Sequence, residues 1–304
     1  MILPTKPIPW AIKISNLLQE IQKITGESIY PIKVQDIAID IAKQFFPESP
    51  ITKISGESFD GASEGMLCRV PNTKDSWGII YNTNISSSGR INFTLAHELG
   101  HYLLHRMSLE NGEIKCSRDD MRRWNSEYGQ REAEANEFAS YLLMPRNLFE
   151  DRIGSNEITL HLIKDISNYF NVSITAAILK WLQFTDKRAI LVVGKDGFID
   201  WVWHSKAMLK SDIFLRPKVR PIELPKESLA VNTDPCIDAL KGIKQASTVW
   251  PFDEEVHEMT LKADTYDMTI TLLLFSNDKS SKWDEVLEET EPIDIFERIT
   301  ANHN

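Results

Sequence analysis

The stretch FTLAHELGHYLLH at residues 93–105 combines a helical pattern of apolar residues with His97, Glu98 and His101. Residues four apart in a helix lie one turn apart on the same face, so both imidazoles can bind one zinc ion. Glu98 lies beside them and can act as general base toward the attacking water. The alternative is a surface helix with incidental His and Glu. The apolar surroundings argue against it, because unpartnered polar groups are unfavourable in a core helix.

A catalytic zinc ion needs a third protein ligand. The HxxGxxH continuation fails because Met107 stands where its last histidine would be. His105 lies one turn beyond His101, too far along the helix to share a metal ion with His97. The remaining option is a carboxylate from the next predicted helix, residues 127–143.

Four acidic residues of this region are candidates for the third ligand: Glu127, Glu132, Glu134 and Glu137. Ala135, Phe138, Ala139, Leu142 and Leu143 mark the buried face of the helix. At about 100° per residue, only Glu132 points toward that face. We interpret Glu134 and Glu137 as solvated, with a role of Glu134 in packing or in a contact behind a ligand left open. Asn136 lies one turn after Glu132, where its amide can hydrogen-bond a ligand.

Two blocks of sequence, FTLAHELGHYLLH at 93–105 and EAEANEFASYLLMP at 132–145, resemble the signature of ImmA/IrrE-type metallopeptidases. The resemblance implies a zincin-like fold with His97, His101 and Glu132 as ligands of one Zn²⁺ per chain and Glu98 as the catalytic glutamate. Such proteins regulate transcription by cleaving a helix-turn-helix repressor. In the radiation-response members the peptidase is followed by a helix-turn-helix-like segment and a GAF-like domain.

The rest of the chain predicts an α+β protein in three parts. Helices over 8–25 and 34–46 and strands at 51–55, 64–70 and 76–82 belong with the motif helix to a peptidase domain, residues 1–150. Residues 151–185 form a helix-turn-helix-like segment. Residues 186–304 predict an α+β domain with hairpins at 189–203 and 256–275, which the resemblance makes a GAF-like sensor of a small-molecule or other signal.

Composition indicates the cellular compartment and the classes of binding partner that we expect. The chain has 304 residues, 42% hydrophobic, with a formal charge of −10, so binding to a phosphate backbone is disfavoured. The cysteines, Cys68, Cys116 and Cys236, are odd in number and widely spaced, which suits a reducing cytoplasm. We expect no membrane partner, because the N-terminus lacks a signal-peptide pattern and no apolar run is long enough to span a bilayer.

Three further points are open from the sequence. The alternative function is a DNA-binding or ligand-sensing regulator that does not use its peptidase domain, although the helix from Ser173 holds a single basic residue, Lys180. Tyr128 and His105 are candidate oxyanion donors. The strand at 77–82 is either an ordinary core strand or an edge that pairs with the substrate backbone.

Overall fold

A computed structural model describes most of the chain. The described residues are 3–59, 64–73, 75–108, 113–115, 127–211, 214–217, 219–232, 234–263 and 268–276. Over these residues the chain forms two compact units, the first within residues 3–152 and 168–173, the second within residues 153–167 and 174–276. Helices and two sheets confirm the mixed α+β class. The domain boundaries near 150 and 185 stay predictions.

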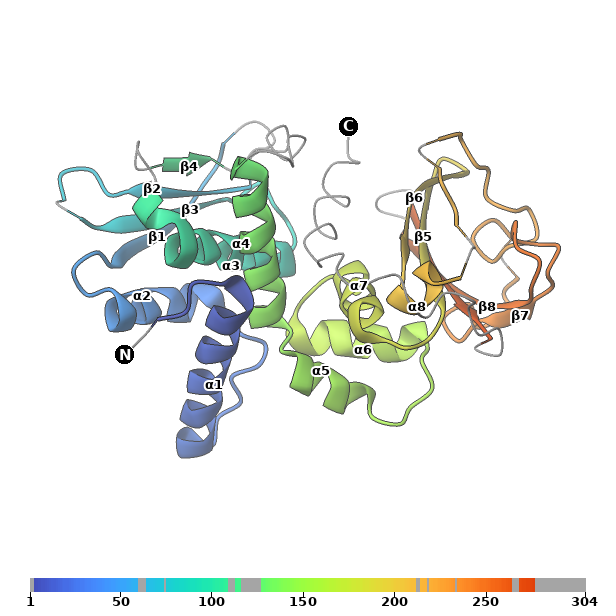
Figure 1. The fold of residues 1–304 in the computed structure, drawn as a ribbon, viewed down its shortest axis with the longest axis horizontal. Coiled ribbons are helices and arrows are strands. Elements are labelled where there is room, and N and C mark those ends of the chain that lie inside the picture. Colours follow the sequence, from blue (N-terminus) through green and yellow to red (C-terminus); the bar gives the residue numbers. More distant parts are fainter. Residues whose placement is uncertain are drawn as a thin grey trace. The chain divides into compact units, whose positions relative to one another are not determined.

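The first unit holds the motif helix and its neighbours (Figure 1). Its helices are α1 (Pro7–Thr25), α2 (Val34–Phe45), α3 (Ser88–His105), the short 3₁₀ helix η1 (Arg106–Ser108), α4 (Glu127–Leu143) and α5 (Arg146–Ile153). The first four α-helices confirm the predicted ones within a few residues, whereas α5 was not predicted. Its sequence, RNLFEDRI, buries only Phe149, so it carries almost no helical apolar pattern.

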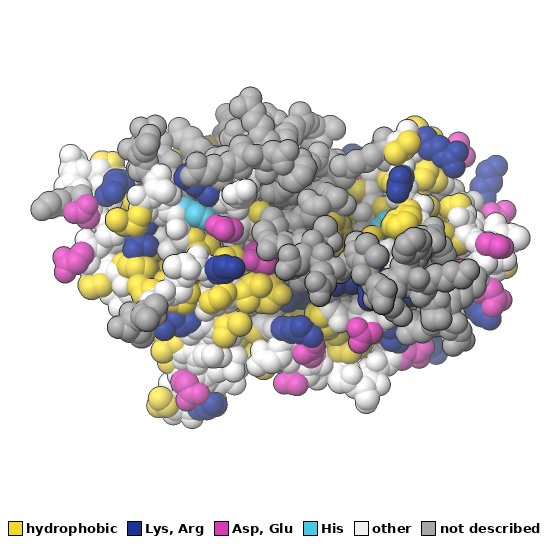
Figure 2. Space-filling view, viewed as in Figure 1, with side chains coloured by type: hydrophobic (Ala, Val, Ile, Leu, Met, Phe, Trp, Pro, Cys, Tyr) yellow, Lys and Arg dark blue, Asp and Glu magenta, His cyan; other side chains and the backbone are white. Residues whose placement is uncertain are grey.

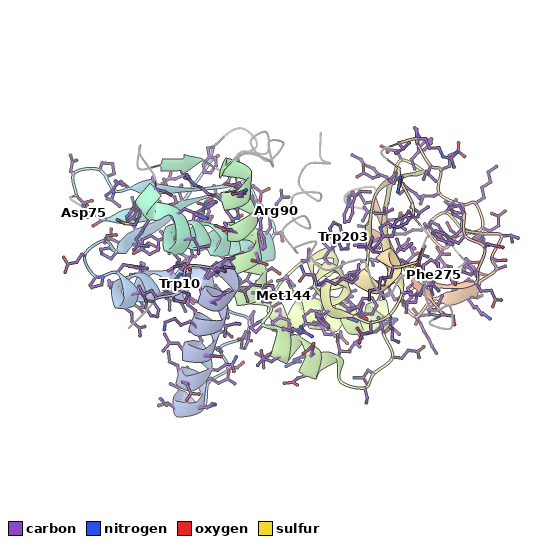
Figure 3. The ribbon with its side chains drawn as sticks, in the orientation of Figure 1. Trp10, Asp75, Arg90, Met144, Trp203 and Phe275 are labelled. Atoms are coloured by element: carbon purple, nitrogen blue, oxygen red, sulfur yellow. The ribbon has the colours of Figure 1, made fainter. Side chains whose placement is uncertain are left out.

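Helix α1 begins and ends where its sequence predicts. Pro7 occupies the first turn, where its missing N–H costs no hydrogen bond. Gly26 ends the helix with φ 73°, a left-handed conformation that favours glycine, and donates its N–H to the Gln22 carbonyl. Trp10, labelled in Figure 3, packs its buried ring against Phe45 at 5.2 Å between ring centroids. The contact between Trp10 and Phe45 packs α1 against α2.

A four-stranded sheet with the order β1-β3-β2-β4 accompanies these helices. The strands are β1 (Ile51–Glu57), β2 (Gly65–Arg69), β3 (Trp77–Asn82) and β4 (Glu113–Lys115). β3 pairs in parallel with β1 and antiparallel with β2, so both of its edges are occupied. The suggestion that residues 77–82 offer a free edge to a substrate is therefore wrong, because β1 pairs with one edge of β3 and β2 pairs with the other.

Helices α3 and α4 pack closely against each other, and α3 also packs against β2 and β3 (Figure 1). The close approach occurs at Gly100, between the two motif histidines. A Cβ added there would lie 3.0 Å from Phe138 Cδ1 and 3.2 Å from the Ala135 Cα. Glycine at 100 and alanine at 135 thus let α4 approach the histidine-bearing face of α3.

The second unit is built around a five-stranded antiparallel sheet with the order β6-β5-β9-β8-β7. Its elements are α6 (Leu160–Phe170, whose last turn belongs to the first unit), α7 (Ile174–Phe184), β5 (Ala189–Lys195), β6 (Phe198–His204), α8 (Lys206–Leu209), β7 (Ile243–Gln245), β8 (Val256–Ala263) and β9 (Met268–Phe275). Both predicted hairpins are confirmed. The core includes Ile190, Val192, Trp250 and Leu273.

The helix-break-helix predicted within 156–184 is present. α6 ends at Phe170, Asn171 adopts a left-handed φ of 51°, and α7 begins at Ile174. Asparagine tolerates this conformation better than most residues, which explains the break. Over the described residues, no helix combines the length and the apolar character needed to cross a membrane. The sequence WDEVLEETEPIDIFERI at 283–299 predicts a surface helix interrupted at Pro292, and this segment lies outside the described residues.

Candidate metal centre

Helix α3 carries the motif into the interior of the first unit. It begins after Ser87, whose side chain accepts a hydrogen bond from the Arg90 N–H and so caps the first turn. His97 is 6% exposed, and Glu98 and His101 are fully buried. The surface-helix alternative for the motif is therefore wrong, and these three polar residues share the core with apolar neighbours.

The structure brings His97, His101 and Glu132 together in one buried group (His97 and His101 from α3, Glu132 from α4). The two imidazole Nε2 atoms are 3.0 Å apart. One carboxylate oxygen of Glu132 lies 3.2 Å from His97 Nε2, and the other lies 3.1 Å from His101 Nε2. Three potential ligand atoms from two helices therefore converge on one point.

The charges of the group are strongly coupled. Burial alone would lower the pKa of His97, but hydrogen bonding to Glu132 and its charge raise that pKa to about 9. Burial would raise the pKa of Glu132, but the two imidazoles hold it well below its usual value. Burial lowers the pKa of His101 to about 4, although Glu132 opposes this shift. The pKa values of these three side chains are thus set by burial and by one another.

This donor set fits a zinc ion. Two imidazole nitrogens and one carboxylate oxygen are ligands that Zn²⁺ binds in catalytic sites, leaving a further position for water. Two neutral imidazoles that face each other through Nε2 would place their lone pairs in contact, and a shared cation relieves this repulsion. These residues could hold a metal ion.

Asn136 orients the first of the two histidines. Its side-chain carbonyl accepts a hydrogen bond from His97 Nδ1–H at 2.9 Å, and Asn136 is 4% exposed. A proton on Nδ1 leaves the Nε2 lone pair directed toward Glu132 and His101. The structure thus places Asn136 behind a ligand candidate, where the helical spacing predicts it.

Glu98 lies beside the group, under the beginning of β2. A Cβ added at Gly65 would lie 2.9 Å from Glu98 Oε1 and 2.5 Å from Thr94 Cγ2. The absence of a side chain at Gly65 therefore leaves room for the Glu98 carboxylate. The charge of Glu98 also contributes to the raised pKa of His97, which places the carboxylate within electrostatic reach of the ligand group.

His105 and Glu134 also join the site, and the sequence did not predict their contact with each other. His105 Nδ1 lies 3.0 Å from His101 Nδ1, and His105 Nε2 lies 2.8 Å from Glu134 Oε2. The assignment of Glu134 to a purely solvated helix face is wrong, since one of its oxygens meets a buried histidine. The spacing of four between His101 and His105 was the available signal. Both ring nitrogens of His105 are engaged, which argues against it as an oxyanion donor.

Glu137 does not join the group. Glu137 is partly exposed and lies outside the His97–His101–Glu132 cluster. The side chains of Glu127 and Tyr128 lie outside the described residues, so the oxyanion role suggested for Tyr128 stays a prediction.

The class of HExxH metalloproteins is defined by a helix that bears HExxH, and in this chain a second helix adds a carboxylate beside a small sheet. Within this class, residues 49–182 match the family model of peptidase family M78, described as the IrrE N-terminal-like domain. Residues 49–182 are thus similar to the IrrE N-terminal-like domain, which confirms the resemblance seen in the sequence. No curated protein matches the chain at a significant level.

Proposed function

We propose that this protein is a zinc-dependent metalloendopeptidase of regulatory type, which hydrolyses a peptide bond in a protein substrate. The observation that carries the proposal is the buried convergence of His97 Nε2, His101 Nε2 and the Glu132 carboxylate. The match of residues 49–182 to a peptidase family supports the same activity. Stress-responsive control of transcription is the biological role we propose for it.

The mechanism follows from the placement of the side chains. His97, His101 and Glu132 would hold the zinc ion, and a bound zinc ion supplies Lewis acidity that activates water and polarises the scissile carbonyl. The Glu98 carboxylate accepts the proton of the attacking water as general base. It then donates this proton to the nitrogen of the leaving amine. Asn136 keeps His97 in the tautomer that presents Nε2.

We propose a helix-turn-helix transcriptional repressor as the substrate. The acidic chain, with a formal charge of −10, is poorly suited to bind nucleic acid itself. Among the side chains coloured by type in Figure 2, acidic and basic ones are interspersed, and this coloured part of the face shows no continuous basic track for a phosphate backbone. A protein target therefore agrees better with the charge pattern than DNA does.

The structure of α7 argues against the alternative, a DNA-binding regulator that makes no use of its peptidase domain. A recognition helix must expose basic or amide side chains to the major groove. Residues 177–182 of α7 are all buried, including Lys180, which is 2% exposed. The basic residue of this helix is thus unavailable for phosphate or base contacts. The C-terminal unit remains our candidate for a sensor of the activating signal.

The test is cleavage of a repressor encoded beside this gene, followed by intact-mass spectrometry. Zinc-loaded wild-type protein should produce two fragments whose masses sum to the repressor plus one water. Glu98→Gln should retain zinc and fold but cleave slower by about 10²-fold or more, because the general base is lost.

The exposed Glu150→Gln is the matched control, since Glu150 pairs with Arg146 on the surface of α5. It should cleave at the wild-type rate. Undiminished cleavage by Glu98→Gln would remove Glu98 from the mechanism, and a wild-type protein that binds zinc but leaves every neighbouring repressor intact would contradict the proposed substrate.

A further inference from the structure

Behind His101 a chain of hydrogen bonds leads away from the ligand group to the protein surface. His101 Nδ1 contacts His105 Nδ1 at 3.0 Å, and His105 Nε2 contacts Glu134 Oε2 at 2.8 Å. The side chain of His105 is 7% exposed, whereas that of Glu134 is 40% exposed. The chain thus connects a fully buried imidazole to a carboxylate that water can reach.

The protons in this chain have one consistent arrangement if His101 presents Nε2 to a metal ion. His101 must then carry its proton on Nδ1 and donate it to His105 Nδ1. His105 accepts at Nδ1 and therefore carries its proton on Nε2, which donates to the Glu134 carboxylate. Every hydrogen bond in the chain points from the ligand group toward the negative charge of Glu134.

The two histidines of the group are therefore supported differently. His97 donates to the neutral amide of Asn136, whereas His101 donates to an imidazole that is polarised by a carboxylate. An acceptor that is polarised by a neighbouring negative charge draws the Nδ1 proton of His101 away from the ring and makes Nε2 a stronger electron-pair donor. The support behind His101 is the stronger of the two.

We infer that His105 and Glu134 are positioning residues that fix the tautomer of His101 and strengthen it as a metal ligand, an inference that rests on the proposed zinc site. Neither residue touches the ion or the substrate. Their effect reaches the site through one hydrogen bond of His101. Glu134, which sequence patterning assigns to solvent, thereby acquires a role in metal affinity.

Zinc affinity, measured by competition with a chelator, tests this inference without any substrate. His105→Phe keeps a ring of similar size but removes both nitrogens, and should lower the affinity about 10- to 100-fold, as loss of a hydrogen-bond partner behind a ligand commonly does. Glu134→Gln keeps an acceptor for His105 but removes the charge, and should lower the affinity about three- to tenfold. Glu137→Gln, three residues along the same helix, is the matched control and should bind zinc as the wild type does.

Nuclear magnetic resonance of ¹⁵N-histidine-labelled, zinc-loaded protein gives a readout that a merely structural role would not move. Long-range ¹H–¹⁵N correlations should place the proton of His105 on Nε2 and that of His101 on Nδ1. A proton on His105 Nδ1 would overturn the inference, because that nitrogen could then not accept from His101.

Each outcome separates this inference from the proposed function. Should His105→Phe misfold, Glu134→Gln still decides, because its partly exposed side chain can change without opening the core. The positioning role is refuted if folded Glu134→Gln binds zinc as tightly as the wild type does, and His105→Phe, where it folds, does the same. The proposed function would still stand after that result. A wild-type chain that binds no zinc refutes the proposed function, and the inference with it.

Discussion

Replacing Gly100 with alanine should damage the metal centre without touching a ligand. Gly100 lies between His97 and His101 on α3 and faces α4 at their closest approach. The new Cβ would lie 3.0 Å from Phe138 Cδ1, 3.2 Å from the Ala135 Cα and 3.3 Å from the Ala135 carbonyl oxygen, where ordinary contact begins at 3.4 Å. The Phe138 ring can turn aside, but the two Ala135 atoms are backbone. Helix α4 must therefore move away by a few tenths of an ångström.

Two opposing effects set the change in stability. Alanine is a better helix former than glycine by about 1 kcal/mol. Overpacking of a close helix contact costs about 1–3 kcal/mol, and the backbone on the facing side places this variant in the upper part of that range. The packing effect therefore exceeds the helix propensity, and Gly100→Ala should be destabilised by about 1–2 kcal/mol.

Metal affinity should fall together with stability. A metal constellation needs its ligands within about 0.5 Å of the productive arrangement, and Glu132 moves with α4 away from both histidines. We expect zinc affinity to fall about tenfold, a loss of about 1.4 kcal/mol. Chelator competition gives the affinity, and hydrogen exchange of peptides from α3 and α4 gives the local stability. A variant that matches the wild type in both would refute the claim that Gly100 sets the separation of these helices.

Four further outcomes are expected. Glu132→Ala should lower zinc affinity far more than Glu137→Ala in the same competition assay, because only Glu132 supplies charge at both imidazoles. Asn136→Ala should lower the affinity about tenfold, since His97 Nδ1–H loses its acceptor. Burial raises the pKa of the Glu258 carboxyl in the second unit, so its contribution to stability is fully present below 4.5 and is lost as pH rises through the raised pKa. Glu258→Gln should remove this decline, as hydrogen exchange of β8 measured between about pH 4 and 7 will show; a decline equal to that of the wild type would contradict it.

Local sequence patterns were sufficient to predict most of the helices of the first unit. The apolar spacing and the proline and glycine signals located α1 to α4. Helices α1 and α2 each bury one face, whereas every residue of α3 from Thr94 to Leu103 is buried. The same spacing separated Glu132 from Glu137 on α4, since burial within one helix depends on its own periodicity. These are properties that a single element carries in its sequence.

Such patterns could not predict contacts between elements that are distant in the sequence. The occupied edges of β3 follow from a parallel pairing with β1, which precedes it by two strands, and nothing in residues 77–82 specifies that order. The contact of Glu134 with His105 depends on how far α4 is rotated relative to α3, which is set by packing at Gly100. A wheel drawn for α4 alone places Glu134 in solvent and misses the partner.

The most direct test of the account is the zinc content of the purified chain by inductively coupled plasma mass spectrometry. After removal of loosely bound metal, the wild type should retain about one zinc ion per chain, as three converging ligands of this kind imply. A folded double variant, His97→Ala with His101→Ala, should retain almost none, because only Glu132 would remain of the three donors. A wild type without zinc, or a double variant with as much zinc as the wild type, would contradict the claim that these residues form a metal centre.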